Sequence, residues 1–150
     1  LGVSYSHAPH YRETAAAAIL EMRRQVPQDV FDAEGLLQKG LLLRHLILPG
    51  QYRDSMRILD WVRASLGKET LVSLMSQYTP LYRAKEIKAL SRKLTTFEYE
   101  KVIDYFFEIG LKNGFMQKRS SATGEYTPTF DLSGVAAAES FMKREENHHD

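Results

Sequence analysis

The sequence predicts an α/β domain, because two aliphatic runs flank a helical pattern. The first run, residues 40–48, ends at Pro49-Gly50, and the second, residues 70–77, ends before Pro80. Short aliphatic runs bounded by glycine or proline are typical of strands buried on both faces in a helix-covered parallel sheet. A strand, a helix and a strand within about 38 residues fit a right-handed βαβ crossover with parallel strands.

Length and composition indicate one ordinary globular domain. A chain of 150 residues buries roughly 68–70% of its extended surface. Its 20 Lys and Arg oppose 19 Asp and Glu, and the net charge of +1 creates no bulk field that would attract nucleic acid or an anionic membrane. No apolar run approaches the roughly 20 residues that span a bilayer, and no signal-peptide pattern opens the chain. We therefore expect a soluble, cytoplasmic protein that binds neither nucleic acid nor membrane.

The absence of cysteine restricts the chemistry of the chain. With no cysteine, this chain cannot form disulfides, use thiolate catalysis or hold an iron–sulfur cluster by thiolates. His7 and His10 have no third ligand nearby in the sequence, and His148-His149 lies in a charged tail. Because structural metal sites need three or four ligands, we expect no metal site in this chain.

The segment before the first aliphatic run contains a helix and a flap. The helix is predicted from about His10 until Pro27 ends it. Its apolar face comprises Ala15, Ala18, Ile19, Met22 and Val26, while the charged residues, Arg23 among them, face away. Residues 28–37 contain an extended piece and the turn 32–35, which predicts a small hairpin or flap.

Between the two runs, Asp54 is the expected N-cap of a helix that ends at Gly67. After the second run, residues 78–94 contain a short helix with apolar residues on one side. Five basic residues make this segment locally positive: Arg83, Lys85, Lys88, Arg92 and Lys93. A solvated helix face and an anion-binding surface both explain this charge.

The next helix starts at a capping box, residues 95–98, and is expected to continue through Gly110 until Asn113-Gly114 ends it. Residues 115–117 predict one more short strand. From Ser120 the chain is polar and rich in turn residues. We therefore divide it into an α/β unit, residues 1–118, and a C-terminal extension, residues 119–150.

Arg44 and His45 are the chemically notable residues of the first strand, since the chain lacks the glycine-rich, nucleophile-elbow and His-Glu-x-x-His motifs. Neighbouring strand residues point to opposite faces, so at least one of the two must be buried and partnered. Arg44 is interpreted equally well as part of an internal salt bridge or as a ligand contact. His45 is interpreted as a satisfied core or interface histidine.

Several segments together resemble a known family. The sequence Leu-Leu-Arg-His-Leu-Ile-Leu-Pro-Gly at 42–50 and Leu-Met-Ser-Gln-Tyr at 74–78 resembles the C-terminal half of radical SAM proteins of the pyruvate formate-lyase activating enzyme type. The match is best with a less characterised, activating-protein-like branch. Further matching segments are Asp54-Ser55, 58–61, Pro80, 96–99, 125–128 and 130–131.

The resemblance implies half of a partial (β/α)6 barrel of the TIM type, with parallel strands and helices on the convex face. Residues 40–48 would form the fifth strand and residues 70–77 the sixth. The family binds S-adenosylmethionine (SAM) beside a [4Fe-4S] cluster and is an oxidoreductase class that acts through a 5′-deoxyadenosyl radical. By position, the SAM-contacting residues would be Arg44, Leu46, Leu48, Pro49, Gly50, Gln77 and Tyr78. Arg53 stands where relatives carry an acidic residue, with Asp54 next to it.

The cysteine motif of the family belongs to the half that this sequence does not contain. The resemblance therefore implies a fragment or truncated product that has no catalytic residue of its own and is inactive alone. Its expected partners are the missing N-terminal half of the barrel and a glycyl-radical enzyme or another protein substrate. The unpaired edge of the strand at 40–48 also favours homo-oligomers.

Two other interpretations remain open. The chain could be a small non-catalytic α/β module, flavodoxin-like in outline, that binds a metabolite or protein at residues 49–54. That interpretation predicts helices on both faces of the sheet, whereas the half-barrel predicts one uncovered face. A structural subunit that completes the barrel of another chain would also leave one face uncovered.

Overall fold

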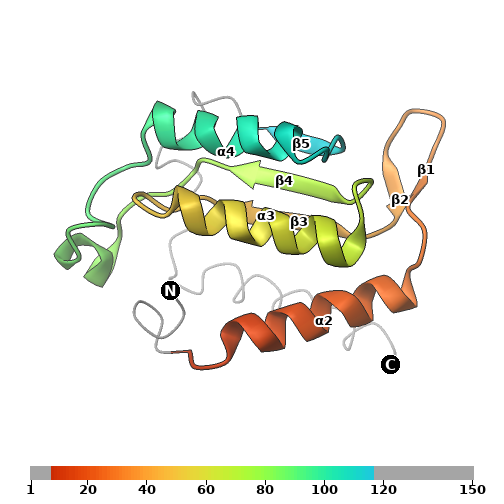
Figure 1. Ribbon diagram of the computed structural model, residues 1–150, viewed down its shortest axis with the longest axis horizontal. Helices are drawn as coiled ribbons and strands as arrows, with labels where there is room; N and C mark the ends of the chain where they lie inside the picture. The colour runs from red at the N-terminus through yellow and green to blue at the C-terminus, as the bar shows by residue number, and fades with distance from the viewer. Residues whose placement is uncertain (1–7, 117–150) are drawn as a thin grey trace, which may run out of the picture.

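The computed structural model describes residues 8–116. This part of the chain is an α/β arrangement, as predicted (Figure 1). None of the described helices is both long and apolar enough to cross a membrane. In chain order, the elements are α2 (Tyr11–Gln25), β1 (Val30–Phe31), β2 (Leu37–Lys39), β3 (Leu42–Leu46), α3 (Tyr52–Leu66), β4 (Leu71–Met75), the 3-10 helix η1 (Tyr82–Glu86), α4 (Thr96–Glu108) and β5 (Gly114–Met116).

The main sheet has three strands in the order β3-β4-β5. β3 is parallel to β4, with Leu42 opposite Leu71 and Leu46 opposite Met75. β4 is in turn parallel to β5. The predicted parallel pair is therefore confirmed, although each strand is shorter than its aliphatic run, and the short third strand is also confirmed. Within residues 8–116, the outer edge of β3 has no neighbouring strand.

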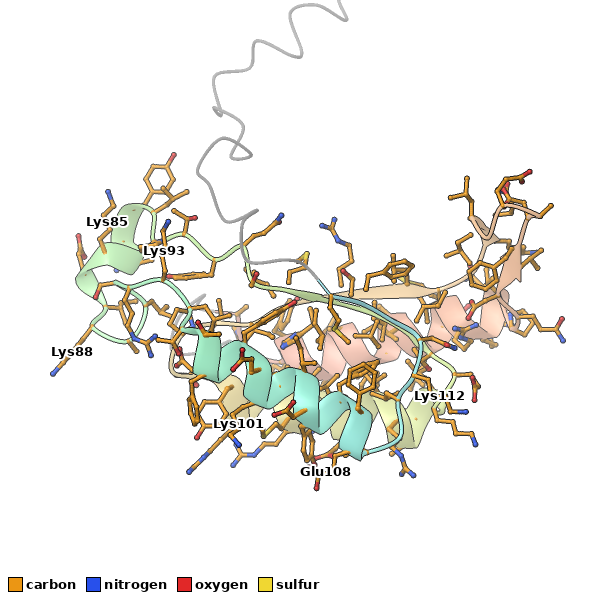
Figure 2. The ribbon with its side chains drawn as sticks, turned by 90° about the horizontal axis from the view of Figure 1, so that it is seen from above. Lys85, Lys88, Lys93, Lys101, Glu108 and Lys112 are labelled. Carbon is orange, nitrogen blue, oxygen red and sulfur yellow. The ribbon has the colours of Figure 1, made fainter. Side chains whose placement is uncertain are left out.

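α3 and α4 pack side by side on one face of this sheet, and Figure 2 shows both helices on the same side of the strands. Apolar side chains of the strands and the two helices form the core between the layers. No helix of the described range covers the opposite face (Figure 2). The core residues are Ile47, Leu59, Val62, Val72, Leu74, Leu94, Tyr99, Val102, Phe106 and Leu111.

The ends of α3 and α4 follow from local hydrogen bonding. Thr95 and Glu98 form the predicted capping box at the start of α4. α4 ends earlier than expected, because Gly110 adopts φ 83° and the N–H groups of Gly110 and Leu111 bond back to Phe107 and Phe106, as in a Schellman motif. The prediction that this helix continues through Gly110 to residues 113–114 was wrong.

The predicted cap of α3 was also wrong. Gln51, rather than Asp54, occupies the N-cap position, and α3 starts at Tyr52. Asp54 lies in the first turn instead, where a carboxylate interacts favourably with the positive end of the helix dipole. Gly67 does end the helix, with φ 90°.

α2 and the β1–β2 hairpin match the predicted helix and flap, but the packing face of α2 differs from the prediction. No residue of α2 is buried, and Met22 is 52% exposed. Arg23, expected to face away, is half-buried because its guanidinium bonds Asp29 at 3.0 and 3.2 Å. The inward side chain at this part of α2 is therefore Arg23, in an ion pair, and not Met22 in an apolar contact.

Two further expectations need correction. β3 is not buried on both faces, since Leu42 is 38% exposed and Arg44 is exposed. The reason is that β3 is an edge strand of the described sheet and helices cover one face only. The short helix expected within residues 78–94 is a five-residue 3-10 helix, η1. In the turns that follow it, the side chains of Leu90 and Leu94 are buried.

Candidate functional site at the carboxyl edge of the sheet

The two faces of β3 place its polar residues in different environments. The His45 ring nitrogen Nε2 lies 2.9 Å from Ser55 Oγ of α3, so His45 points toward the helices. Because side chains alternate along a strand, Arg44 points to the opposite, open face. Its guanidinium donates to Met75 Sδ at 3.1 Å, a weak acceptor on the neighbouring strand.

Burial lowers the pKa of His45, and the nearby carboxylate of Asp54 opposes this shift only in part. His45 is thus held neutral with its ring bonded to Ser55, in agreement with the interpretation as a satisfied core histidine. For Arg44, no carboxylate of the described residues lies within ion-pair distance. The internal salt bridge considered from the sequence is therefore absent among residues 8–116.

The loop after β3 is held in place by one carboxylate. Gly50 has φ 76°, a conformation that glycine adopts without strain, and its N–H donates to Glu98 Oε1 at 2.6 Å. Pro49 beside it is fully buried. The loop at 48–50 is consequently fixed to the start of α4.

Glu98 gathers several donors besides Gly50. Arg92 bonds both of its oxygens, at 2.7 and 2.8 Å, and Thr95 donates through its backbone N–H and its hydroxyl. The Arg92 hydrogen bonds, with those from Thr95 and Gly50, outweigh desolvation and hold the pKa of Glu98 far below its usual value. The capping box could be predicted from the sequence, but the bond to Gly50, 48 positions away, could not.

At the end of β4, Gln77 and Tyr78 are half-buried. Tyr78 donates its hydroxyl to the carbonyl of Leu90 at 2.7 Å, and burial raises its pKa. Ser76, which precedes them, is only 6% exposed, and its Oγ has no hydrogen-bond partner in the described structure. Sequence reasoning did not single out Ser76, because a serine at a strand end carries no distinctive pattern.

The structure brings the seven sequence-predicted residues to the same region of the sheet. β3 and β4 end in register, Leu46 opposite Met75, so the segments 48–50 and 77–78 follow the strands at one edge. Arg44 and Leu46 precede that edge on the open face. Within this set, the N–H of Gly50 and the hydroxyl of Tyr78 are already bonded inside the chain.

Potential metal ligands are not grouped in the described part of the chain. No group of three or more histidine, cysteine, aspartate or glutamate side chains that could hold a metal occurs among residues 8–116. His10 lies at the N-terminus of α2, while His7, His148 and His149 lie outside the described residues, as do the family-like segments 125–128 and 130–131.

The fold and this edge define an α/β protein with a small parallel sheet. The chain is 33% identical over 79 residues to the uncharacterized protein MJ0674 of Methanocaldococcus jannaschii. The match covers 51% of this chain and 23% of that protein, so the chain spans less than a quarter of the curated relative that it matches. No protein-family model matches the chain, and no solved structure does.

Proposed function

We propose that this chain is the C-terminal part of a radical SAM protein that resembles pyruvate formate-lyase activating enzymes. In this proposal β3 and β4 are the fifth and sixth strands of a partial (β/α)6 barrel, and the carboxyl edge forms part of a SAM site. The supporting observation is the parallel β3–β4 pair with both packed helices on one face. The family resemblance of residues 42–50 and 74–78 supplies the activity, and a cytoplasmic location belongs to the same proposal.

The uncovered face favours this proposal over the non-catalytic module. A flavodoxin-like sheet carries helices on both faces, whereas the described helices α3 and α4 share one face. In a barrel, the uncovered face would be the concave side, with Arg44 pointing into it. β5, the short strand predicted near residues 115–117, extends the sheet beyond the strand that would be the sixth.

The residues present fit the two cofactors of the family differently. A [4Fe-4S] cluster is held by cysteine thiolates, and this chain has no cysteine, so the cluster would belong to another segment and no catalytic step is assigned to this chain. SAM fits better. Arg44 could pair with its carboxylate, and the buried Ser76 hydroxyl, which lacks a described partner, lies at the same edge as Gln77. When bound, SAM would supply the adenosyl group for radical chemistry.

Two hydrogen-bond donors of the carboxyl edge are already used within the chain, which limits the polar contacts available to SAM. Gly50 N–H and Tyr78 hydroxyl are occupied by Glu98 and Leu90. Residues 48–50 would therefore contact the adenine of SAM by shape and apolar packing. The polar contacts are left to Arg44, Ser76 and Gln77.

Reconstitution with the missing half tests the proposal. The chain is co-expressed with a separate segment that carries the first four strands and the three-cysteine motif of the family, and iron and sulfide are added anaerobically. We expect a brown, oxygen-sensitive complex that binds SAM in calorimetry, whereas the chain alone binds it weakly or not at all. A colourless complex, or full SAM affinity of the isolated chain, would refute the half-site.

Matched variants then test the site within the complex. Arg44→Ala should weaken SAM binding about tenfold or more, since a charge-assisted hydrogen bond contributes about 1.5–3 kcal/mol. Arg57→Ala removes an exposed arginine from α3 and should leave SAM affinity unchanged. Equal affinities of both variants would remove Arg44 from the site.

A further inference from the structure

Positive charge gathers on the segment between β4 and α4. Residues 76–95 contain five Lys and Arg but one Asp or Glu, while the whole chain contains 20 and 19. Figure 2 shows Lys85, Lys88 and Lys93 at the end of the molecule formed by η1 and the following turns. We call this the basic end, and its basic residues are Arg83, Lys85, Lys88, Arg92 and Lys93.

Much of this charge is not neutralised within the described structure. Arg92 is paired with Glu98. Arg83, Lys85 and Lys88 are exposed and take part in none of the ion pairs found among residues 8–116. Their ammonium and guanidinium groups are therefore available to an anionic partner.

The backbone of the basic end is held in place by buried side chains and hydrogen bonds. Leu90 and Leu94 are buried, and the Tyr78 hydroxyl bonds the carbonyl of Leu90. The bidentate Arg92–Glu98 pair joins the same turns to the start of α4. A surface whose backbone is fixed in this way loses less conformational freedom when it binds.

Two large aromatic side chains are exposed within this segment or directly after it. Tyr82 is 80% exposed and has φ 48°, a left-handed conformation that is disfavoured for residues other than glycine. Phe97, at the start of α4, is 58% exposed, and Lys101 Nζ lies 5.7 Å from the centre of its ring. Exposed aromatic rings among cations are typical of the anchor points of protein interfaces.

We infer that the basic end, with Tyr82 and Phe97, docks an acidic segment of a protein partner that carries an apolar anchor residue. The charge is local, because the whole chain carries only +1, so complementarity to a short acidic segment is favoured over binding of a long polyanion. The surface borders the carboxyl edge, since Ala89 and Arg92 lie beside Gly50. A partner bound there sits next to the candidate site, but the inference goes beyond that site and does not depend on it.

Fluorescence anisotropy with a short labelled peptide of Glu and Asp around one Phe tests this inference on the full chain. We expect saturable binding that weakens at least about tenfold on going from low to high salt, because exposed charge pairs are screened. The triple variant Arg83→Glu/Lys85→Glu/Lys88→Glu should lose at least about tenfold in affinity. The control Arg12→Glu/Lys39→Glu/Lys68→Glu makes the same charge change at exposed sites elsewhere and should stay within about twofold.

Tyr82→Gly tests the aromatic contribution separately from folding. Glycine tolerates a φ of 48°, so the midpoint of thermal unfolding should stay level or rise while peptide affinity falls. No binding of the acidic peptide, equal losses in both triple variants, or tighter binding of a single-stranded oligonucleotide than of the peptide would overturn the inference. Unchanged affinity in Tyr82→Gly would remove Tyr82 as an anchor contact.

Discussion

The region before β3 and the α3–β4–α4 region that follows it differ sharply in packing. α2 has no buried residue, and the β1–β2 hairpin stands away from the other elements (Figure 1). α3 and α4, by contrast, each bury three or more residues against the sheet. Because buried apolar area is the main source of stability, the fold is stabilised chiefly after β3, and the earlier region is held by a few polar contacts.

The largest expected effect comes from placing one substitution in both regions. Phe106 is fully buried, whereas Phe31 of the hairpin is 46% exposed. Phe106→Ala should lower the free energy of unfolding by about 3–5 kcal/mol through lost burial and a cavity, and Phe31→Ala by about 0.5 kcal/mol. Urea denaturation measures both, and similar losses would show that the two regions do not differ as described.

The second test compares the two carboxylates that hold segments together by hydrogen bonds, Glu98 in the later region and Asp29 in the earlier one. Glu98→Gln should cost about 2 kcal/mol at neutral pH, discounted because Arg92 is partly exposed. The pKa of Glu98 is lowered in the fold, first by Arg92, so its contribution is complete above the ordinary value of 4.5 and is lost as the pH falls below it. The gap between wild type and variant should therefore narrow in acid; a constant gap would contradict this.

Asp29 is the counterpart of Glu98 in the first region. Burial opposes its ionisation, but Arg23 and the Leu41 N–H lower its pKa overall. Asp29→Asn should loosen α2 and the hairpin while global stability falls by only about 1 kcal/mol. Hydrogen exchange should show faster amides in residues 11–39 and unchanged amides in α4. Uniformly faster exchange would mean that the two regions unfold together.

A glycine pair gives a smaller and sharper comparison. A Cβ at Gly40 would lie 2.7 Å from both Asp29 Oδ1 and Leu37 Cδ1, whereas a Cβ at Gly67 would meet nothing within 4 Å. Gly40→Ala should cost about 1–3 kcal/mol through overpacking at the hairpin junction. Gly67→Ala should also cost about 1–3 kcal/mol, because φ 90° and ψ 168° lie in a backbone region that is essentially restricted to glycine. Thermal unfolding measures both, and an unchanged midpoint for Gly40→Ala would be inconsistent with the junction described.

The smallest expected effect is weak self-association through the outer edge of β3, which has no partner within the described residues. We expect the apparent mass in size-exclusion chromatography to rise with concentration. Leu42→Lys places a charge on this strand and should shift the equilibrium toward monomer. A single monomer peak for the wild type at high concentration would contradict the prediction.

The strands and helices could be predicted largely because their signals are local. Aliphatic runs defined β3 and β4, and the capping box defined the start of α4. The errors arose where distant residues decide the outcome: Arg23 turns inward because Asp29 accepts its hydrogen bonds. The partial exposure of β3 depends on which strands lie beside it, and no local pattern reports that.

The candidate site was predictable to a similar extent. Strand alternation placed Arg44 and His45 on opposite faces, and strand ends placed residues 48–50 and 77–78 at one edge. Glu98 and Ser76 were not identified as site residues, since the first acts through a contact far along the chain and the second carries no motif.

The position of the loop after β3 depends on Glu98, which accepts hydrogen bonds from Gly50 and Arg92. Replacing its carboxylate would break the hydrogen bonds to Gly50 and to Arg92 together. The loop at 48–50 and the turns around Arg92 would then both become more mobile. A ligand that requires the present shape of this loop should then dissociate faster, even though the residues that contact the ligand are unchanged.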